Sequence, residues 1–203
     1  MKKYAVLHEP GDIVTLAGTR FVVLDVERRG SLPDSLFLLA LESVGASEFG
    51  SSNNYAESDL KKAVDKWLED MGKRGLDNAK LIPREIDLTT LDGSGCYGKL
   101  SVKAAPLTLD EAREYADIIP NAERWCWLAT GWSGPSKSDG DLALCVNSYG
   151  DWHYDGCSGS DGIRPALKAP SILFEDSEAG LDLSKIPTDD LLQEIHRRLA
   201  EKA

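Results

Sequence analysis

Residues 161–170, with the sequence DGIRPALKAP, contain an arginine in a run that is otherwise typical of a buried strand. Arg164 at this position is either a hook for a ligand at the surface or a brace inside the protein. Gly162 allows a close approach of another segment, and Pro165 limits hydrogen bonding along a strand. A guanidinium group can donate to several carbonyl groups at once. We therefore expect Arg164 to be a structural brace whose loss destabilises the fold.

The carboxy-terminal third around this segment is predicted to form short strands separated by Gly, Ser and Asp. Their sequences are RWCWLAT, LALCVNS, DWHYDG and GIRPALKA, beginning at residues 124, 142, 151 and 162. Residues 11–44 have the pattern of a β-meander, with a turn at Gly18. Strands that follow one another through short turns pair in antiparallel fashion.

Helical periodicity replaces the strand pattern in two places before residue 175 and again in the last residues of the chain. Ser58 can cap a helix that Gly72 ends. Thr108 and Glu111 form a capping box for a second helix, which we expect to end at Pro120. The sequence therefore predicts an α+β fold of mixed, mostly antiparallel sheets with two packed helices.

The predicted organisation has three parts: a domain at 1–174, an acidic linker at 175–187 and a separate C-terminal helix at 188–203. The last helix carries an apolar stripe that is available to another surface. We expect it to contribute to self-association or to capture of a partner, and to be separable from the domain.

Composition narrows the class of protein. Of the 203 residues, 42% are hydrophobic and 28% charged, which is ordinary for a globular protein. The net charge of −11 argues against direct binding to a nucleic-acid backbone and is compatible with an acidic face for a basic partner. No apolar run approaches the roughly 20 residues of a membrane span, and no signal peptide is recognised. Four cysteines are few for a chain of this length, and no export signal is recognised. We therefore expect reduced thiols and a cytoplasmic location.

Cysteine and histidine offer one set of chemical candidates. Cys126, Cys145, His153 and Cys157 are residue types that bind zinc, but their spacing lacks the paired C-x2-C pattern. Cys145 and His153 could instead serve as nucleophile and base, without any local signature of such an enzyme. No metal site is predicted from these residues, and an enzyme using Cys145 and His153 stays an alternative.

Acidic and glycine-rich segments offer two further candidates. The aspartates at 139, 141, 151, 155 and 161 leave calcium open as a cofactor, although no EF-hand is present and Asp-Gly pairs are typical of turns. GSGCYG, residues 93–98, matches G-x-G-x-x-G, but the segment after it is β-like rather than helical. We therefore expect a loop there and no bound cofactor.

Aromatic residues form the most suggestive cluster. Trp125 and Trp127 are two apart on a predicted strand and share a face, which favours a structural role in the core. The remaining aromatic residues lie among turn formers, where exposed rings commonly anchor binding surfaces. We predict a binding face made of Trp132, Tyr149, Trp152, His153 and Tyr154.

The order of several motifs resembles a family of unknown function found in bacteria and their phages. The resemblance covers roughly residues 11–173 and is most specific at the closing G-[VI]-R-P-A-L. The family pattern has a tryptophan at the position of Tyr55 and an arginine at the position of Ala129. The resemblance implies a C-type-lectin-like architecture, although the sugar-binding tripeptides of true C-type lectins are absent.

These observations together favour a non-catalytic binding module of phage or prophage origin that recognises a protein partner through its aromatic loops. An acidic inhibitor of a nucleic-acid-binding host defence protein is a second hypothesis. Salt-sensitive binding to such a protein would distinguish it from the first.

Overall fold

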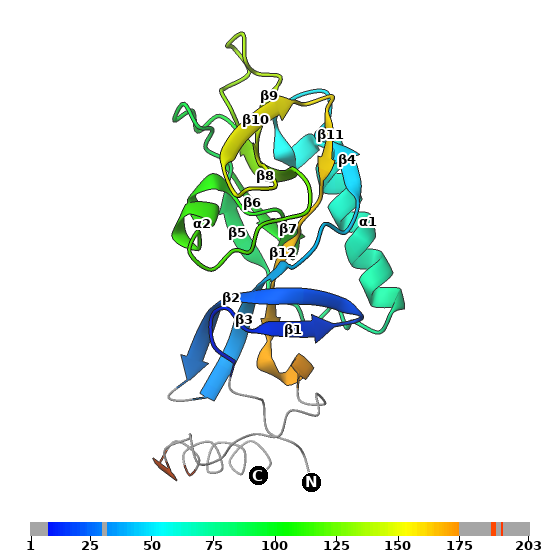
Figure 1. The fold of residues 1–203 in the computed structure, drawn as a ribbon, viewed down its shortest axis with the longest axis vertical. Coiled ribbons are helices and arrows are strands. Elements are labelled where there is room, and N and C mark those ends of the chain that lie inside the picture. The colour runs from blue at the N-terminus through cyan, green and yellow to red at the C-terminus, as the bar shows by residue number, and fades with distance from the viewer. Residues whose placement is uncertain (1–7, 30–31, 175–187, 190–191, 193–203) are drawn as a thin grey trace.

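A computed structural model describes residues 8–29, 32–174, 188–189 and 192 of the chain (Figure 1). Within 8–29 and 32–174 the fold is α+β, with mostly antiparallel sheets and two α-helices, as predicted. The predicted linker at 175–187 lies outside the described residues. Of the predicted C-terminal helix at 188–203, only Thr188, Asp189 and Leu192 are described.

The first sheet contains the predicted meander and has the order β1-β2-β3-β12-β7. A two-residue turn at Ala17 and Gly18, both with positive φ, joins β1 to β2. All pairs in this sheet are antiparallel. Its strands are β1 (Ile13–Leu16), β2 (Thr19–Arg29), β3 (Leu32–Ala40), β7 (Ala104–Ala105) and β12 (Ala166–Pro170).

The second sheet has the order β10-β9-β8-β11-β4 and lies at the other end of the molecule from β1 and β2 (Figure 1). Its one parallel contact joins β8 to β11. Its strands are β4 (Ala46–Glu48), β8 (Cys126–Gly131), β9 (Leu142–Val146), β10 (Trp152–Gly156) and β11 (Ser160–Gly162). A separate ribbon pairs β5 (Arg84–Asp87) with β6 (Lys99–Val102). Because β6 follows the glycines of GSGCYG directly, the helix that a dinucleotide site needs is replaced by a strand.

The two helices begin at the predicted caps. The Ser58 side chain accepts from the Lys61 amide at the start of α1 (Asp59–Lys73). The predicted capping box of Thr108 and Glu111 opens α2 (Leu109–Glu114). The expected end at Pro120 is wrong. The chain leaves the helix after Glu114 and continues as tight turns, in which the Tyr115 carbonyl accepts from two later amides. Short 3-10 turns occupy Tyr55–Glu57 and Ser171–Phe174.

Residues 161–170, DGIRPALKAP, pass from one sheet to the other. GIRPALKA does not form one strand, because β11 ends at Gly162 and β12 begins at Ala166. A Cβ atom on Gly162 would lie 2.8 Å from the Trp125 carbonyl oxygen, so glycine is needed for this close approach. The residues that follow carry the chain into the centre of the first sheet, between β3 and β7.

Arg164 lies at this crossing and is 7% exposed. Its Nε atom donates to the Ala40 carbonyl at 3.0 Å, and its Nη1 atom donates to the Pro120 carbonyl at 3.1 Å. The side chain thus connects the end of β3 to the segment before β8. These contacts have the geometry expected of a brace, and their contribution to stability stays a prediction.

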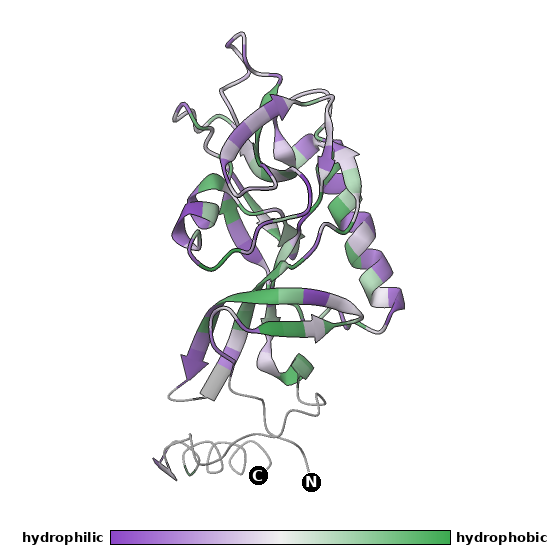
Figure 2. Cartoon of the chain, in the orientation of Figure 1, coloured by the Kyte–Doolittle hydropathy of each residue, from purple (hydrophilic) through white to green (hydrophobic). Residues whose placement is uncertain are grey.

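Two apolar clusters form the core. The larger contains Phe21, Tyr55 and Trp127, and the smaller contains Leu128 and Leu144, with Trp132 packed against it. Figure 2 shows hydrophobic residues along β2 and an alternation of hydrophobic and hydrophilic residues along α1. None of the helices in the described part of the chain is long and apolar enough to cross a membrane.

Candidate functional site

Four of the five predicted binding residues, including His153, are exposed. Tyr149 is 81% exposed, Trp152 is 44% exposed and Tyr154 is 46% exposed, whereas Trp132 is half-buried. Trp152, His153 and Tyr154 lie in strand β10 rather than at a loop tip, which corrects the expected location. Their exposure follows from the position of β10 at the edge of the second sheet.

Alternation along β10 separates its side chains into two sets. Tyr154 packs on Trp132, with ring centroids 4.5 Å apart, on one face of the sheet. His153 packs on Trp125, with centroids 4.6 Å apart, on the other. Trp125 is only half-buried and therefore belongs partly to this surface, although its structural role was predicted to be in the core.

A groove of about 320 Å³ lies beside Trp132 and β10. We call it the aromatic groove. Its rim and floor combine four predicted binding residues with three leucines and one arginine. The lining residues are Leu91, Leu109, Arg113, Trp132, Leu144, Trp152, His153 and Tyr154. Tyr149 lies in the turn between β9 and β10 and does not line the groove, so the structure brings together four of the five predicted residues.

The loop before β6 forms one wall of the aromatic groove. The Leu91 amide donates to the Gly131 carbonyl at 3.0 Å, and the Asp92 amide donates to the Trp132 carbonyl at 3.2 Å. This loop therefore continues the hydrogen bonding of β8 beyond the end of the strand. The two bonds fix Leu91, which is 39% exposed, next to Trp132.

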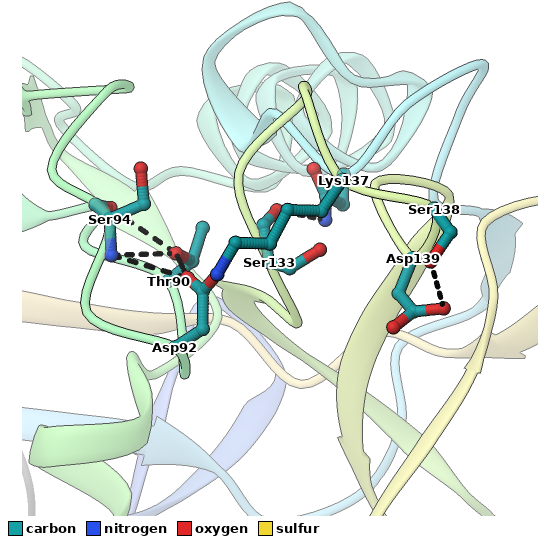
Figure 3. A network of polar contacts seen from close by, with 8 residues as sticks. Thr90, Asp92, Ser94, Ser133, Lys137, Ser138 and Asp139 are labelled. Atoms are coloured by element: carbon teal, nitrogen blue, oxygen red, sulfur yellow. Dashed lines mark hydrogen bonds and ion pairs between the residues drawn. The ribbon is translucent and has the colours of Figure 1, made fainter.

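A polar network holds the same loop to the β8–β9 loop (Figure 3). The Lys137 ammonium group reaches from its loop to the Asp92 carboxylate at 2.5 Å, and the Thr90 hydroxyl donates to the same carboxylate. Lys137 and Thr90 hold the pKa of Asp92 well below its usual range, so this carboxylate stays charged. The Ser94 amide also donates to Asp92, which closes the turn. The wall of the groove is therefore preformed.

The backbone of β10 offers further binding groups at its outer edge. The amides of Asn147 and Cys157 donate across the β9–β10 hairpin at 3.0 and 2.7 Å. Hydrogen-bonded and non-hydrogen-bonded pairs alternate in an antiparallel ladder. With the register His153 opposite Cys145, the N–H and C=O groups of Trp152 and Tyr154 point away from β9. In the described part of the chain, β9 is the one strand that pairs with β10.

The geometry does not favour the Cys145–His153 pair as a catalytic site. The two residues are opposite one another in the ladder, but Cys145 is fully buried. Burial raises the pKa of the thiols of Cys126, Cys145 and Cys157, which opposes formation of a nucleophilic thiolate. Within the described ranges, no group of three or more His, Cys, Asp or Glu side chains is placed to hold a metal ion, so neither zinc nor calcium gains support.

Several residues of the aromatic groove were not predicted from the sequence. Leu109 and Leu144 are ordinary apolar positions of a helix and a strand, and nothing local distinguishes them from the core. Arg113 was not predicted either, although the capping box one turn earlier is a signal that could have located it. That box fixes the side of α2 on which Arg113 lies. Leu91 has no sequence signal, since its place depends on bonds to residues 40 positions later in the chain.

Comparisons of the chain with family models, with curated proteins and with solved structures find no match in any of the three.

Proposed function

We propose that this protein is a non-catalytic binding module that takes up an extended segment of a protein partner along β10. The observation that supports this proposal most strongly is an exposed edge strand whose aromatic side chains line a preformed groove. Such a segment adds a strand to the sheet through main-chain hydrogen bonds and places alternate side chains in adjacent pockets. Rings of Trp and Tyr are also the most frequent anchors of protein interfaces.

From Trp152 to Tyr154, the edge of β10 lacks the features that usually prevent strand addition. Proteins protect such edges with charged side chains, proline, bulges or a covering element, and the charged residue of β10 is Asp155 near its end. The sequence of β10 is WHYDG, and its register with β9 is regular. The outward N–H and C=O groups of Trp152 and the N–H of Tyr154 are therefore available to an incoming strand, whereas the Tyr154 carbonyl contacts His153 Nδ1 at 3.3 Å. Apolar side chains two residues apart in the partner would lie over the aromatic groove.

Charge adds a second property of the partner. The net charge of −11 favours association with segments that have basic flanking residues and accelerates their encounter at low salt. An acidic inhibitor of a host defence protein would share this salt dependence without needing the groove. Sensitivity to groove substitutions therefore separates the two hypotheses.

The finer expectations from the family resemblance belong to the same proposal. We propose a C-type-lectin-like architecture, a phage or prophage origin and a cytoplasmic location. The two mostly antiparallel sheets joined through GIRPAL support the architecture. Self-association through the C-terminal helix rests on residues that are mostly outside those described.

A selection of linear peptides on the immobilised protein tests the proposed function. We expect selected peptides to share apolar residues two positions apart and to shift the indole N–H signal of Trp132 in NMR spectra. Tyr154→Ala removes the ring, whereas Tyr154→Pro also removes the outward N–H. The proline variant should bind the peptides more weakly than the alanine variant by roughly twofold to tenfold, the value of one hydrogen bond.

Thermal unfolding of both variants serves as the control, because proline is tolerated on an edge strand when its nitrogen faces solvent. Equal peptide affinity for wild type, Trp132→Ala and Tyr154→Pro would refute binding along β10. Affinity that depends on salt alone would favour the acidic-inhibitor hypothesis.

A further inference from the structure

A second cavity, of about 280 Å³, lies beside the β9–β10 turn and is separate from the aromatic groove. We call it the Arg164 cavity. Its walls come from α2, the segment before β8, strand β8 itself and the β9–β10 turn. Most of the lining is apolar, including Leu107, Ala112, Ile119, Leu128 and Val146. Its size is just below the roughly 300–1,000 Å³ typical of small-molecule sites.

Arg164 supplies the one charged group among the described residues that line this cavity. Its bonds to Ala40 and Pro120 use the single N–H of Nε and one of the two N–H groups of Nη1. The Nη2 atom is buried and has no hydrogen-bond partner among the described residues. The ion pairs found in the same part of the chain do not include Arg164, so its charge has no bonded carboxylate.

The positive charge of the buried Arg164 guanidinium group is not compensated by a bonded carboxylate. Buried charges are normally paired, because an uncompensated charge in an apolar environment is costly. Burial lowers the pKa of Arg164, and Cys126 and Glu42 oppose this only in part. An anion held in the cavity would supply the missing partner. The apolar walls would at the same time favour a ligand with a hydrocarbon body.

We propose that the Arg164 cavity is a binding site for a small carboxylic acid with an apolar body. The carboxylate accepts from guanidinium N–H groups that neither Ala40 nor Pro120 uses, and a planar guanidinium is well suited to a carboxylate. The hydrocarbon part lies against Leu107, Leu128 and Val146. This site is independent of the proposed peptide-binding function, although Trp152 contributes to both cavities.

The rim of the Arg164 cavity is structured in advance of binding. The Asn147 side chain accepts from the amides of Tyr149 and Asp151 at 2.8 and 3.0 Å, which fixes the β9–β10 turn. Gly150 has a φ of +88°, and a Cβ atom there would lie 2.7 Å from the side-chain oxygen of Asn121. The turn therefore meets the segment before β8 closely at the edge of the cavity. Tyr149, which does not line the aromatic groove, lines this cavity instead.

Side-chain signals can distinguish the two sites. Leu128 and Val146 line the Arg164 cavity and not the aromatic groove, whereas Trp132 lines the groove and not the cavity. Hexanoate is a suitable probe, and hexanamide is its neutral counterpart. In NMR titrations of the full chain, we expect hexanoate to shift the methyl signals of Leu128 and Val146 and leave the indole signal of Trp132 unchanged. Hexanamide should bind about tenfold more weakly, because it cannot form a charge-assisted bond.

A cavity-filling variant tests the location without removing the arginine. Ala116 is exposed at the rim, so Ala116→Phe should block the cavity with little effect on folding. Ala79→Phe is the matched control, since Ala79 is also exposed and lies outside the cavity. Hexanoate binding should be lost in the first variant and kept in the second. The proposal is wrong if millimolar hexanoate leaves the methyl signals of Leu128 and Val146 unshifted, if hexanamide binds equally well, or if Ala116→Phe binds hexanoate like wild type.

Discussion

Strands β8 and β10 each carry a tryptophan and have opposite environments. All six residues of β8 are buried, whereas the first three residues of β10 are exposed. Only β9 separates the two strands. Strand β8 lies between β9 and β11, and Trp127 packs edge-on against Phe49 with ring centroids 5.5 Å apart. The contrast shows that aromatic content marks neither core nor binding surface, because the position of a strand within its sheet decides.

The largest effect that tests this contrast is expected from one pair of tryptophans. Trp127→Ala should lower the free energy of unfolding by about 3–5 kcal/mol, since it empties a core site and removes the indole bond to the Ser47 carbonyl. Trp152→Ala should change stability by no more than about 1 kcal/mol, because the residue is 44% exposed and lies on an edge strand. Denaturant unfolding of both variants measures the difference. Similar losses would mean that β10 belongs to the core.

Loss of the brace should be the next largest effect. Arg164→Ala removes two charge-assisted bonds between distant segments, at a cost of about 3 kcal/mol, or a fall in Tm of roughly 6–12 °C. Arg164→Lys should recover little of this, because an ammonium group cannot reach both carbonyls in the same plane. A variant that melts like wild type and no longer binds hexanoate would make Arg164 a hook rather than a brace.

The smallest effect concerns Asp161 of β11, on the buried side of the same sheet. One of its carboxylate oxygens is buried without a bonding partner. Burial and Asp155 raise its pKa, and Arg124 and a hydrogen bond from Cys145 oppose this. The folded state therefore holds the proton more tightly than the unfolded chain, and ionisation opposes folding once the pH exceeds the usual aspartate range. Asp161→Asn should stabilise the protein at neutral pH by less than about 1 kcal/mol.

The pH dependence gives this prediction its control. At about pH 3 the carboxyl group is protonated in both states, so the gain from Asp161→Asn should vanish. Asp117→Asn, at an exposed turn, should change stability at neither pH. Thermal melts at both pH values provide the measurement. A gain that persists in acid would have a cause other than the buried charge.

Local sequence accounts for the elements that depend on neighbouring residues. The caps at Ser58 and Thr108 were predicted because their hydrogen bonds reach only three residues along the chain. The meander and the loop at GSGCYG follow from the same short-range chemistry. The end of α2 at Glu114 was not predicted, because no proline or glycine stops the helix there.

The sequence by itself therefore determined the α+β class, the helix starts, the meander and the presence of surplus aromatic residues. Only the tertiary structure decided that Trp127 is buried and Trp152 exposed, because this depends on which strand has neighbours on both edges. Likewise, Arg164 meets Ala40 and Pro120 across 124 and 44 residues of chain. The carbonyls that it joins and the cavity beside it arise from contacts between distant segments, which no local pattern encodes.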